Sequence, residues 1–388
     1  MKLFARFSAA LAVFSFLLAW QTYAQTPQGD RVIRLFEELT NVNAPTGFEG
    51  PVREILKREF TKTGLEVSTD GLGSVIGMLR GAAAQPRIMV DAHLDDVGLM
   101  VRYITEDGFV KFQTLGGWLD QALINQRWVI DTRKGPVLAF SGIRAIHITP
   151  SDVRSRVTPA TEIFLDVGAG SKKEAEALGI RPGDPISPWS PFTPIANNRY
   201  AAKAWDARIG CVLMIEAARR MKEQGIKIPN TIYFVGSVQE EVGMRGAQTA
   251  AKVIKPDLGI SLEVGIAADH PGVGPDLAQE RLGKGPGIFL YDSSMLVNLK
   301  LRDFFIKMSE KEGIPLQTEV ISGYGEDASA MQMHATGTPA INFTVPTRYV
   351  HSHTGIIDRA DFDQALNLLM KVLASLDSKT VAEISSFD

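Results

Sequence analysis

The chain has 388 residues, of which 45% are hydrophobic and 22% are charged, and it contains one cysteine, Cys211. These values are ordinary for a globular protein and exclude a disordered chain, a collagen and a coiled coil. One thiol also excludes an internal disulfide and a zinc site built on several thiolates. With 41 basic and 44 acidic residues the formal net charge is -3, which gives no electrostatic support for a nucleic-acid partner.

Residues 1–24 have the pattern of a secretory signal peptide. Lys2 and Arg6 precede an apolar run over residues 9–20, and a small residue, Ala24, stands before Gln25. The run is shorter than the about 20 apolar residues that span a membrane, so cleavage is favoured over the alternative of an uncleaved anchor. We therefore expect a mature protein that begins near Gln25, is exported to the periplasm or the medium, and keeps no stable membrane insertion.

The mature chain begins with an α/β pattern and then changes to an all-β one. Helices are predicted over residues 30–38 and 50–63, and strands over 74–79 and 87–92. From residue 99 to about 187, short apolar runs separated by Gly, Pro and Asp predict an all-β segment. Its predicted strands cover residues 99–104, 109–112, 128–130, 136–140, 143–148 and 163–167.

A proline-rich stretch over residues 185–194 ends the β segment, and strands then alternate with helices. This alternation predicts a sheet covered by helices on both faces. The predicted helices cover residues 206–222, 244–251, 294–312, 327–333 and 362–376, and the predicted strands 231–238, 258–264, 317–321 and 339–345. The chain thus divides into the signal peptide, an α/β domain made of residues 25–98 and 193–388, and an inserted β domain over 99–192.

Residue types that bind metals stand at the ends of predicted strands, where α/β proteins place their sites. His93 ends an apolar strand, and Asp95 is placed to accept its second ring N–H, as the partners of metal-bound histidines do. Asp206 stands at the start of a predicted helix. Taken alone, His93 is also compatible with a capping histidine, and Asp206 is better explained as a helix N-cap.

Three further strand ends carry such residues. The pair Glu240–Glu241 follows an apolar strand, where two carboxylates are favourable if one binds a cation and the other holds a proton; the alternative is a solvated acidic turn. Glu263 ends another apolar strand, where the alternative is a buried salt bridge. His351 follows the last strand, and we expect His353 to be a surface loop residue.

With one carboxylate taken from the Glu240–Glu241 pair, these segments supply two histidines and three carboxylates, which suits a pair of divalent ions that share one carboxylate. Imidazole and carboxylate ligands without thiolate fit Zn, Co or Mn better than Mg or Ca. Two such ions about 3.5–4 Å apart activate water and polarise a carbonyl, as in aminopeptidases and phosphatases. The remaining carboxylate would be the general base.

Five motifs, in this order, resemble the family of glutamyl and deblocking aminopeptidases. These are co-catalytic di-metal enzymes that build tetrahedral dodecamers and are sometimes labelled endoglucanases. The motifs lie at residues 93–101, 115–118, 238–246, 264–267 and 346–352. The resemblance implies an α/β fold, a three-layer sandwich with a mixed sheet of the zinc-peptidase type. It also implies that the inserted domain is β-barrel-like and serves dimer contacts and access.

The resemblance implies a ligand set residue by residue. Asp206 would be the ligand that bridges two ions. His93 and Glu263 would complete one metal site, and Glu241 and His351 would complete the other.

The resemblance also assigns two roles beyond the ligands. Glu240 would be the general base, and Asp95 would hold the ring of His93. The function it implies is an exported, di-metal-dependent aminopeptidase that acts on short peptides and forms a homo-oligomer, from a dimer up to a dodecamer. The alternatives are a metal-dependent amidase or deacylase on the same scaffold and a non-catalytic peptide-binding relative.

Three positions depart from the family's pattern. Glu263 stands where the family usually has Asp, and Ala207 follows the bridging Asp where Asp or Asn is usual. The segment 323–328 places Glu326 where the family's Gly-Gly-Gly-Thr-Asp-Ala has Thr. Because this loop lies near the substrate in the family, the resemblance implies no preference for a particular N-terminal residue.

Overall fold

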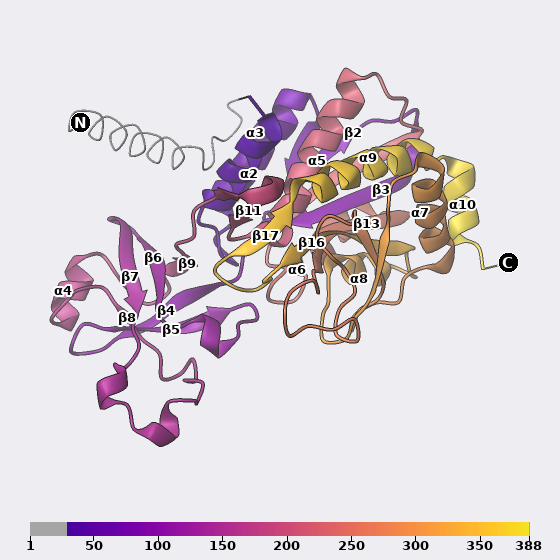
Figure 1. Ribbon diagram of the computed structural model, residues 1–388. Helices are drawn as coiled ribbons and strands as arrows, with labels where there is room; N and C mark the ends of the chain where they lie inside the picture. The colour runs from indigo at the N-terminus through magenta and orange to yellow at the C-terminus, as the bar shows by residue number, and fades with distance from the viewer. Residues whose placement is uncertain (1–28, 388) are drawn as a thin grey trace, which may run out of the picture.

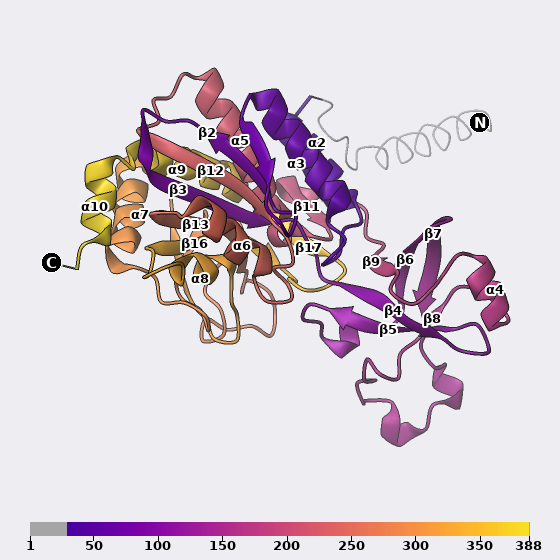
Figure 2. The same ribbon diagram turned by 180° about the vertical axis from the view of Figure 1, so that it is seen from behind.

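The computed structural model describes residues 29–387, so the predicted signal peptide lies outside the described residues. An α/β unit built on an 11-stranded mixed sheet carries a closed six-stranded antiparallel barrel that projects to one side (Figures 1 and 2). This architecture confirms the predicted fold class. Between residues 29 and 387, no helix has the length and apolar character that crossing a membrane requires.

The sheet runs in the order β1-β2-β12-β3-β13-β16-β17-β11-β10, with β14 and β15 attached beside β16. Its four central strands, β12, β3, β13 and β16, are mutually parallel, and they are buried almost throughout except for residues 83–87 at the start of β3. The strands are β1 (Glu66–Thr69), β2 (Val75–Leu79), β3 (Ala83–His93), β10 (Thr193–Ile195), β11 (Arg199–Ala202), β12 (Asn230–Ser237), β13 (Leu258–Ile266), β14 (Gly287–Tyr291), β15 (Gln317–Val320), β16 (Ala340–Arg348) and β17 (Gly355–Asp358).

Helices cover both faces of this sheet. On one face α5 lies across β3 and β13, with α2, α3 and α9 packed against it, while α6 and α8 cover the other face. The helices are α2 (Arg31–Asn41), α3 (Gly50–Thr63), α5 (Trp205–Glu223), α6 (Arg245–Ile254), α7 (Leu299–Glu312), α8 (Asp327–Gln332), α9 (Arg359–Ser375) and α10 (Ser378–Ser385). The central strands are therefore sealed from water, which explains why they are continuous apolar runs in the sequence.

The barrel closes in the order β4-β5-β8-β7-β6-β9 around its own apolar core, in which Trp128 and Leu165 are fully buried. Its elements are β4 (Gly98–Ile104), β5 (Val110–Leu115), β6 (Gln126–Thr132), β7 (Gly135–Ser141), β8 (Leu165–Asp166), α4 (Lys172–Ala177) and β9 (Pro185–Pro188). The barrel is inserted between β3, which precedes it, and β10, which follows it.

Several element predictions were wrong. The run 143–148 is not a strand but leads into a single 3₁₀ turn, Ile146–Ile148, whose apolar side chains face solvent. The strand predicted over 163–167 shrinks to β8, and the helix predicted from 294 begins only at Leu299, where the Asn298 side chain caps it. The strands and helices that the sequence did not predict are short or lie at edges: β1, β9, β10, β11, β14, β17, α4 and α10.

Candidate metal centre

The parallel core of the sheet brings the predicted site residues to one edge. Because β12, β3, β13 and β16 run in the same direction, their carboxyl ends lie side by side. His93 is the last residue of β3, Glu240 and Glu241 follow β12, Glu263 lies within β13, and His351 follows β16. All five side chains therefore reach the same edge, where open α/β sheets place their sites.

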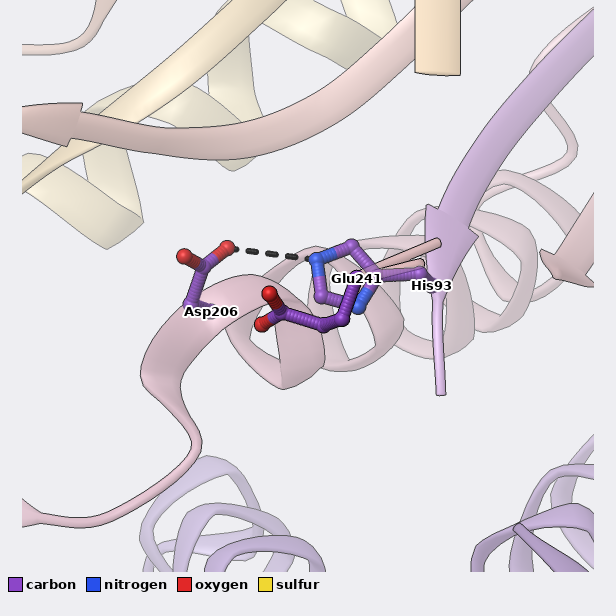
Figure 3. Close-up of side chains that lie close together, drawn as sticks. All are labelled: His93, Asp206 and Glu241. Carbon is purple, nitrogen blue, oxygen red and sulfur yellow. Dashed lines mark hydrogen bonds and ion pairs between the residues drawn. The ribbon is translucent and has the colours of Figure 1, made fainter. Parts of the chain in front are cut away.

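His93 is almost fully buried, with 1% of its side chain exposed, and it points into a group of carboxylates. Its Nε2 lies 3.2 Å from Asp206 Oδ1, as the dashed line in Figure 3 shows, and 3.7 Å from Glu263 Oε2. Its Nδ1 lies 3.1 Å from the main-chain oxygen of Asp95 and 3.6 Å from the carboxylate Oδ1 of the same residue. The ring is thus held from behind by Asp95, with Nε2 directed at the acidic cluster.

Asp206 has one histidine on each of its carboxylate oxygens. Oδ1 faces His93, and Oδ2 lies 3.4 Å from Nε2 of His351. The same His351 nitrogen lies 3.4 Å from Glu241 Oε2. Asp206 reaches this position because it precedes the regular turns of α5: its ψ is 111°, and neither it nor Ala207 has helical backbone angles.

Asp95 organises the turn that carries the glutamate pair. It is fully buried, and its carboxylate accepts hydrogen bonds from the Thr46 hydroxyl at 2.6 Å and from the backbone N–H groups of Glu240 and Glu241 at 3.1 and 3.2 Å. Glu240 then lies with its Oε2 4.0 Å from His93 Nε2. The three acceptor contacts tie the turn after β12 to the end of β3.

The electrostatics of the centre are set by buried carboxylates and two histidines that lie close together. Burial, reinforced by the neighbouring carboxylates, raises the pKa of Glu241 and of Glu263 to about 8. Burial alone would lower the pKa of His351, but the carboxylates of Glu241 and Asp206 raise it to about 9. The same two kinds of contact, with His351 and His93, hold the pKa of Asp206 well below its ordinary value despite its burial.

The residues present fit divalent ions. Glu241 Oε1 and Glu263 Oε2 are buried and accept no hydrogen bond, which is unfavourable unless a cation lies beside them. Among the described residues, His93, Asp206 and Glu241 offer ligand atoms that all lie within 4.8 Å of one another (Figure 3). Two imidazoles with carboxylates and no thiolate form a donor set suited to Zn, Co or Mn.

Sequence reasoning did not find the part of the site that the barrel supplies. The loop after β5 passes directly beside the cluster: a Cβ built on Gly116 would lie 2.9 Å from Glu241 Oε2, and one on Gly117 would lie 3.2 Å from His351 Nδ1. A Cβ on Gly116 would also lie 2.7 Å from Val97 Cγ1 at a φ of 78°, so this position favours glycine, whereas Gly117 leaves a tighter than usual fit. The motif over residues 115–118 contains both glycines, but the sequence does not show which residues they lie next to.

The prediction that His353 lies on the surface was wrong. Only 8% of the residue is exposed, and its ring packs against Trp118 and Trp128 of the barrel, with centroid distances of 5.7 and 4.3 Å. Glu326, in the loop that departs from the family's pattern, is also buried, and burial together with Glu263 and Asp206 raises its pKa well above the ordinary value. That loop therefore borders the cluster.

Comparison with known proteins identifies the family. The sequence profile described as M42 glutamyl aminopeptidase matches residues 73–368. A glutamyl aminopeptidase of Lactococcus lactis subsp. cremoris is 32% identical over 90% of this chain and 98% of its own length.

Two solved structures extend the likeness to the fold. The TET aminopeptidase of Thaumarchaeota archaeon SCGC AB-539-E09 has a TM-score of 0.89 and 43% identity over 92% of this chain and 99% of its own. The TET1 peptidase of Pyrococcus horikoshii, described as assembling into a tetrahedron or a large octahedral shell, has a TM-score of 0.80 and 28% identity over 89% of this chain and 100% of its own. The chain thus belongs to the M42 glutamyl aminopeptidase family, which confirms the predicted family and the prediction of a metallo-aminopeptidase.

Proposed function

We propose that this chain is an exported, di-metal-dependent aminopeptidase that removes N-terminal residues from short peptides. The observation that carries the proposal is Asp206, whose two carboxylate oxygens face two different histidines at 3.2 and 3.4 Å. A carboxylate with a separate imidazole on each oxygen has the arrangement that a ligand shared by two ions requires. The buried oxygens of Glu241 and Glu263 without hydrogen-bond partners support it.

The ligand set divides into two halves around Asp206. His93 and Glu263 would hold one ion, since Nε2 and Oε2 lie 3.7 Å apart, and His351 and Glu241 would hold the other, with Nε2 and Oε2 3.4 Å apart. When bound, two divalent ions lower the pKa of a water molecule and polarise the scissile carbonyl.

Glu240 is placed to move the proton in this reaction. Its carboxylate lies beside His93 without being part of either ligand pair, and its backbone N–H is fixed by Asp95. In the proposed reaction Glu240 takes a proton from the attacking water and returns it to the leaving amine, so that one group serves as base and then as acid. Asp95 contributes by orienting both the His93 ring and the Glu240–Glu241 turn.

Three features of the wider molecule belong to the same proposal. Residues 1–24 would be removed on export. The inserted domain over 99–192 would shape access to the centre between the two parts of the catalytic domain, residues 25–98 and 193–388. The chain would act as a homo-oligomer, as the described assembly of the Pyrococcus horikoshii peptidase suggests.

The test uses the chain from Gln25 onward, stripped of metal and reloaded with Zn, Co or Mn. We expect metal-dependent release of p-nitroaniline from aminoacyl-p-nitroanilides with a free amine and none from their N-acetylated forms. Glu240→Gln should lower kcat by about 10²–10⁴-fold while two ions per chain stay bound, and Glu310→Gln, on the exposed face of α7, is the matched control. Release of acetate from the N-acetylated forms, with no p-nitroaniline from either set of substrates, would favour a deacylase. A Glu240→Gln variant with full activity would refute the assigned base.

A further inference from the structure

The side chains of the two histidines that follow β16 point into different parts of the molecule. His351 points its Nε2 at Asp206 and Glu241. His353, two residues later, points into the barrel, where its ring meets Trp128 edge-on with centroids 4.3 Å apart and an interplanar angle of 76°. This short segment therefore joins the candidate metal centre to the inserted domain.

The aromatic partners of His353 are themselves fixed. Trp118 and Trp128 lie 5.5 Å apart. Trp118 donates its indole N–H to the main-chain oxygen of Gly98 at 3.2 Å, and Trp128 donates to the Ser141 hydroxyl at 3.0 Å. Trp128 is fully buried in the barrel core. The three rings form an interface that cannot shift without disturbing the barrel, and we call this cluster of His353, Trp118 and Trp128 the aromatic latch.

The latch continues directly into the loop that covers the centre. Trp118 follows Gly117, whose backbone faces His351, and Gly116, whose backbone faces Glu241. His351 is thus linked to the barrel in two ways. Its own segment carries His353, which packs against Trp128, and Gly117 of the barrel lies next to the His351 ring. Of the predicted ligands, these two glycines lie next to Glu241 and His351. The other two, His93 and Glu263, belong to the strands β3 and β13.

The backbone that carries His351 needs such support. Tyr349 and His351 both have left-handed backbone angles, with φ of 60° and 55°, which side-chain-bearing residues adopt only when neighbouring contacts hold them there. A hydrogen bond between the Thr354 and Ser190 hydroxyls at 2.7 Å adds a second tie between this segment and the chain that leaves the barrel. Loss of the aromatic latch would remove the first of these two restraints on the His351 backbone.

We propose that the aromatic latch positions His351, and with it the Glu241 half of the centre, so that the inserted domain controls the affinity of one of the two metal sites. This inference rests on the proposed function, because it takes His351 and Glu241 as ligands. His353 and Trp118 act here as positioning residues that touch neither ion nor substrate. Outer contacts of this kind typically change metal affinity by about 10–100-fold.

The experiment measures zinc binding to the metal-stripped chain by isothermal titration calorimetry. We expect two sites in the wild type, and in His353→Ala a loss of at least about tenfold at one site, with the other within about threefold. Trp118→Leu, in the other domain, should weaken the same site. His353→Phe, which keeps a ring of similar size between the tryptophans, should restore the affinity to within about threefold. His147→Ala, an exposed histidine of the barrel, is the control.

Each outcome decides the proposal. Two sites that keep wild-type affinity in both His353→Ala and Trp118→Leu would overturn the latch, as would an equal loss at both sites that His353→Phe does not restore. Because His353→Ala empties a buried position, Trp118→Leu and His353→Phe carry the test if that variant fails to fold. A wild type that binds fewer than two ions would instead refute the proposed di-metal function.

Discussion

Glu280 offers a pH-dependent test of how buried acids are accommodated away from the metal centre. Its side chain is fully buried, with Oε1 accepting a hydrogen bond from the Thr344 hydroxyl at 2.5 Å and Oε2 accepting none. Gly265 and Gly287 make room for it: a Cβ on either would lie within 2 Å of the carboxyl group, at 1.8 and 1.9 Å. Glu280→Gln keeps the shape and the donor of a protonated carboxyl but cannot ionise.

The size of the effect follows from the pKa of Glu280. Burial, together with Glu319 and Asp361, raises it from 4.5 to about 8. Between these two values the folded chain holds a proton that the unfolded chain has lost, so the stability of the folded state falls as the pH rises. The loss amounts to about 1.4 kcal/mol per pH unit and to at most about 5 kcal/mol over the whole window. Glu280→Gln should abolish this loss of stability with rising pH.

The assay is urea unfolding of both proteins, saturated with metal, at about pH 5 and about pH 9. At the lower pH, about half a unit above the ordinary pKa of 4.5, we expect the free energies of unfolding to differ by less than about 1 kcal/mol, because little of the window has been crossed. At the higher pH the glutamine variant should be more stable by several kcal/mol. Glu310→Gln, at an exposed position, should not alter the pH dependence. The reasoning is wrong if wild type and Glu280→Gln lose stability in parallel.

Two further substitutions test the packing around the centre. Arg208→Met should lower the free energy of unfolding by about 4 kcal/mol, because the buried guanidinium donates to the main-chain oxygens of Leu39, Ala44 and Leu94 and each unpaired buried acceptor costs about 1–3 kcal/mol; an unchanged urea midpoint would contradict this. Gly116→Ala should lower zinc affinity by about tenfold, because its Cβ, at a φ of 78°, would lie 2.7 Å from Val97 Cγ1 and 2.9 Å from Glu241 Oε2. Gly142→Ala, which meets nothing within 4 Å, is the control, and equal affinities would show that the loop can yield.

The sequence was most informative where the chain is buried on both sides. The central strands β3, β12, β13 and β16 each contain a mainly apolar run, so a His or Glu at its end or just after it stands out. The parallel alternation of strand and helix then implied that these residues meet at one edge. For this reason the pattern alone predicts that His93, Glu240 and Glu263 belong to one site.

The sequence was least informative about contacts made across the two domains. Gly117 lies in a loop, and His353 follows a strand. The role of each depends on the part of the other domain that packs against it, and sequence periodicity does not encode such a contact. His353 was assigned to the surface because its own segment is short and polar, whereas the barrel buries it. Conversely, Ile143, Ile146 and Ile148 predicted a strand by composition, yet they are 62%, 61% and 73% exposed in an irregular loop of the barrel.

The place of the barrel in the chain explains why its backbone takes part in the site. The barrel begins at Gly98, five residues after His93, and the chain leaves it into β10, which pairs antiparallel with β11 and so brings the chain back to the carboxyl edge shortly before Asp206. An insertion between two such segments has both its connections at the carboxyl edge of the sheet, so it must stand over the centre. From there the loop after β5 can reach Glu241 and His351, provided that two glycines let it approach. The positions of His93 and Glu263 are then determined by the sheet, whereas those of His351 and Glu241 also depend on how the two domains are joined.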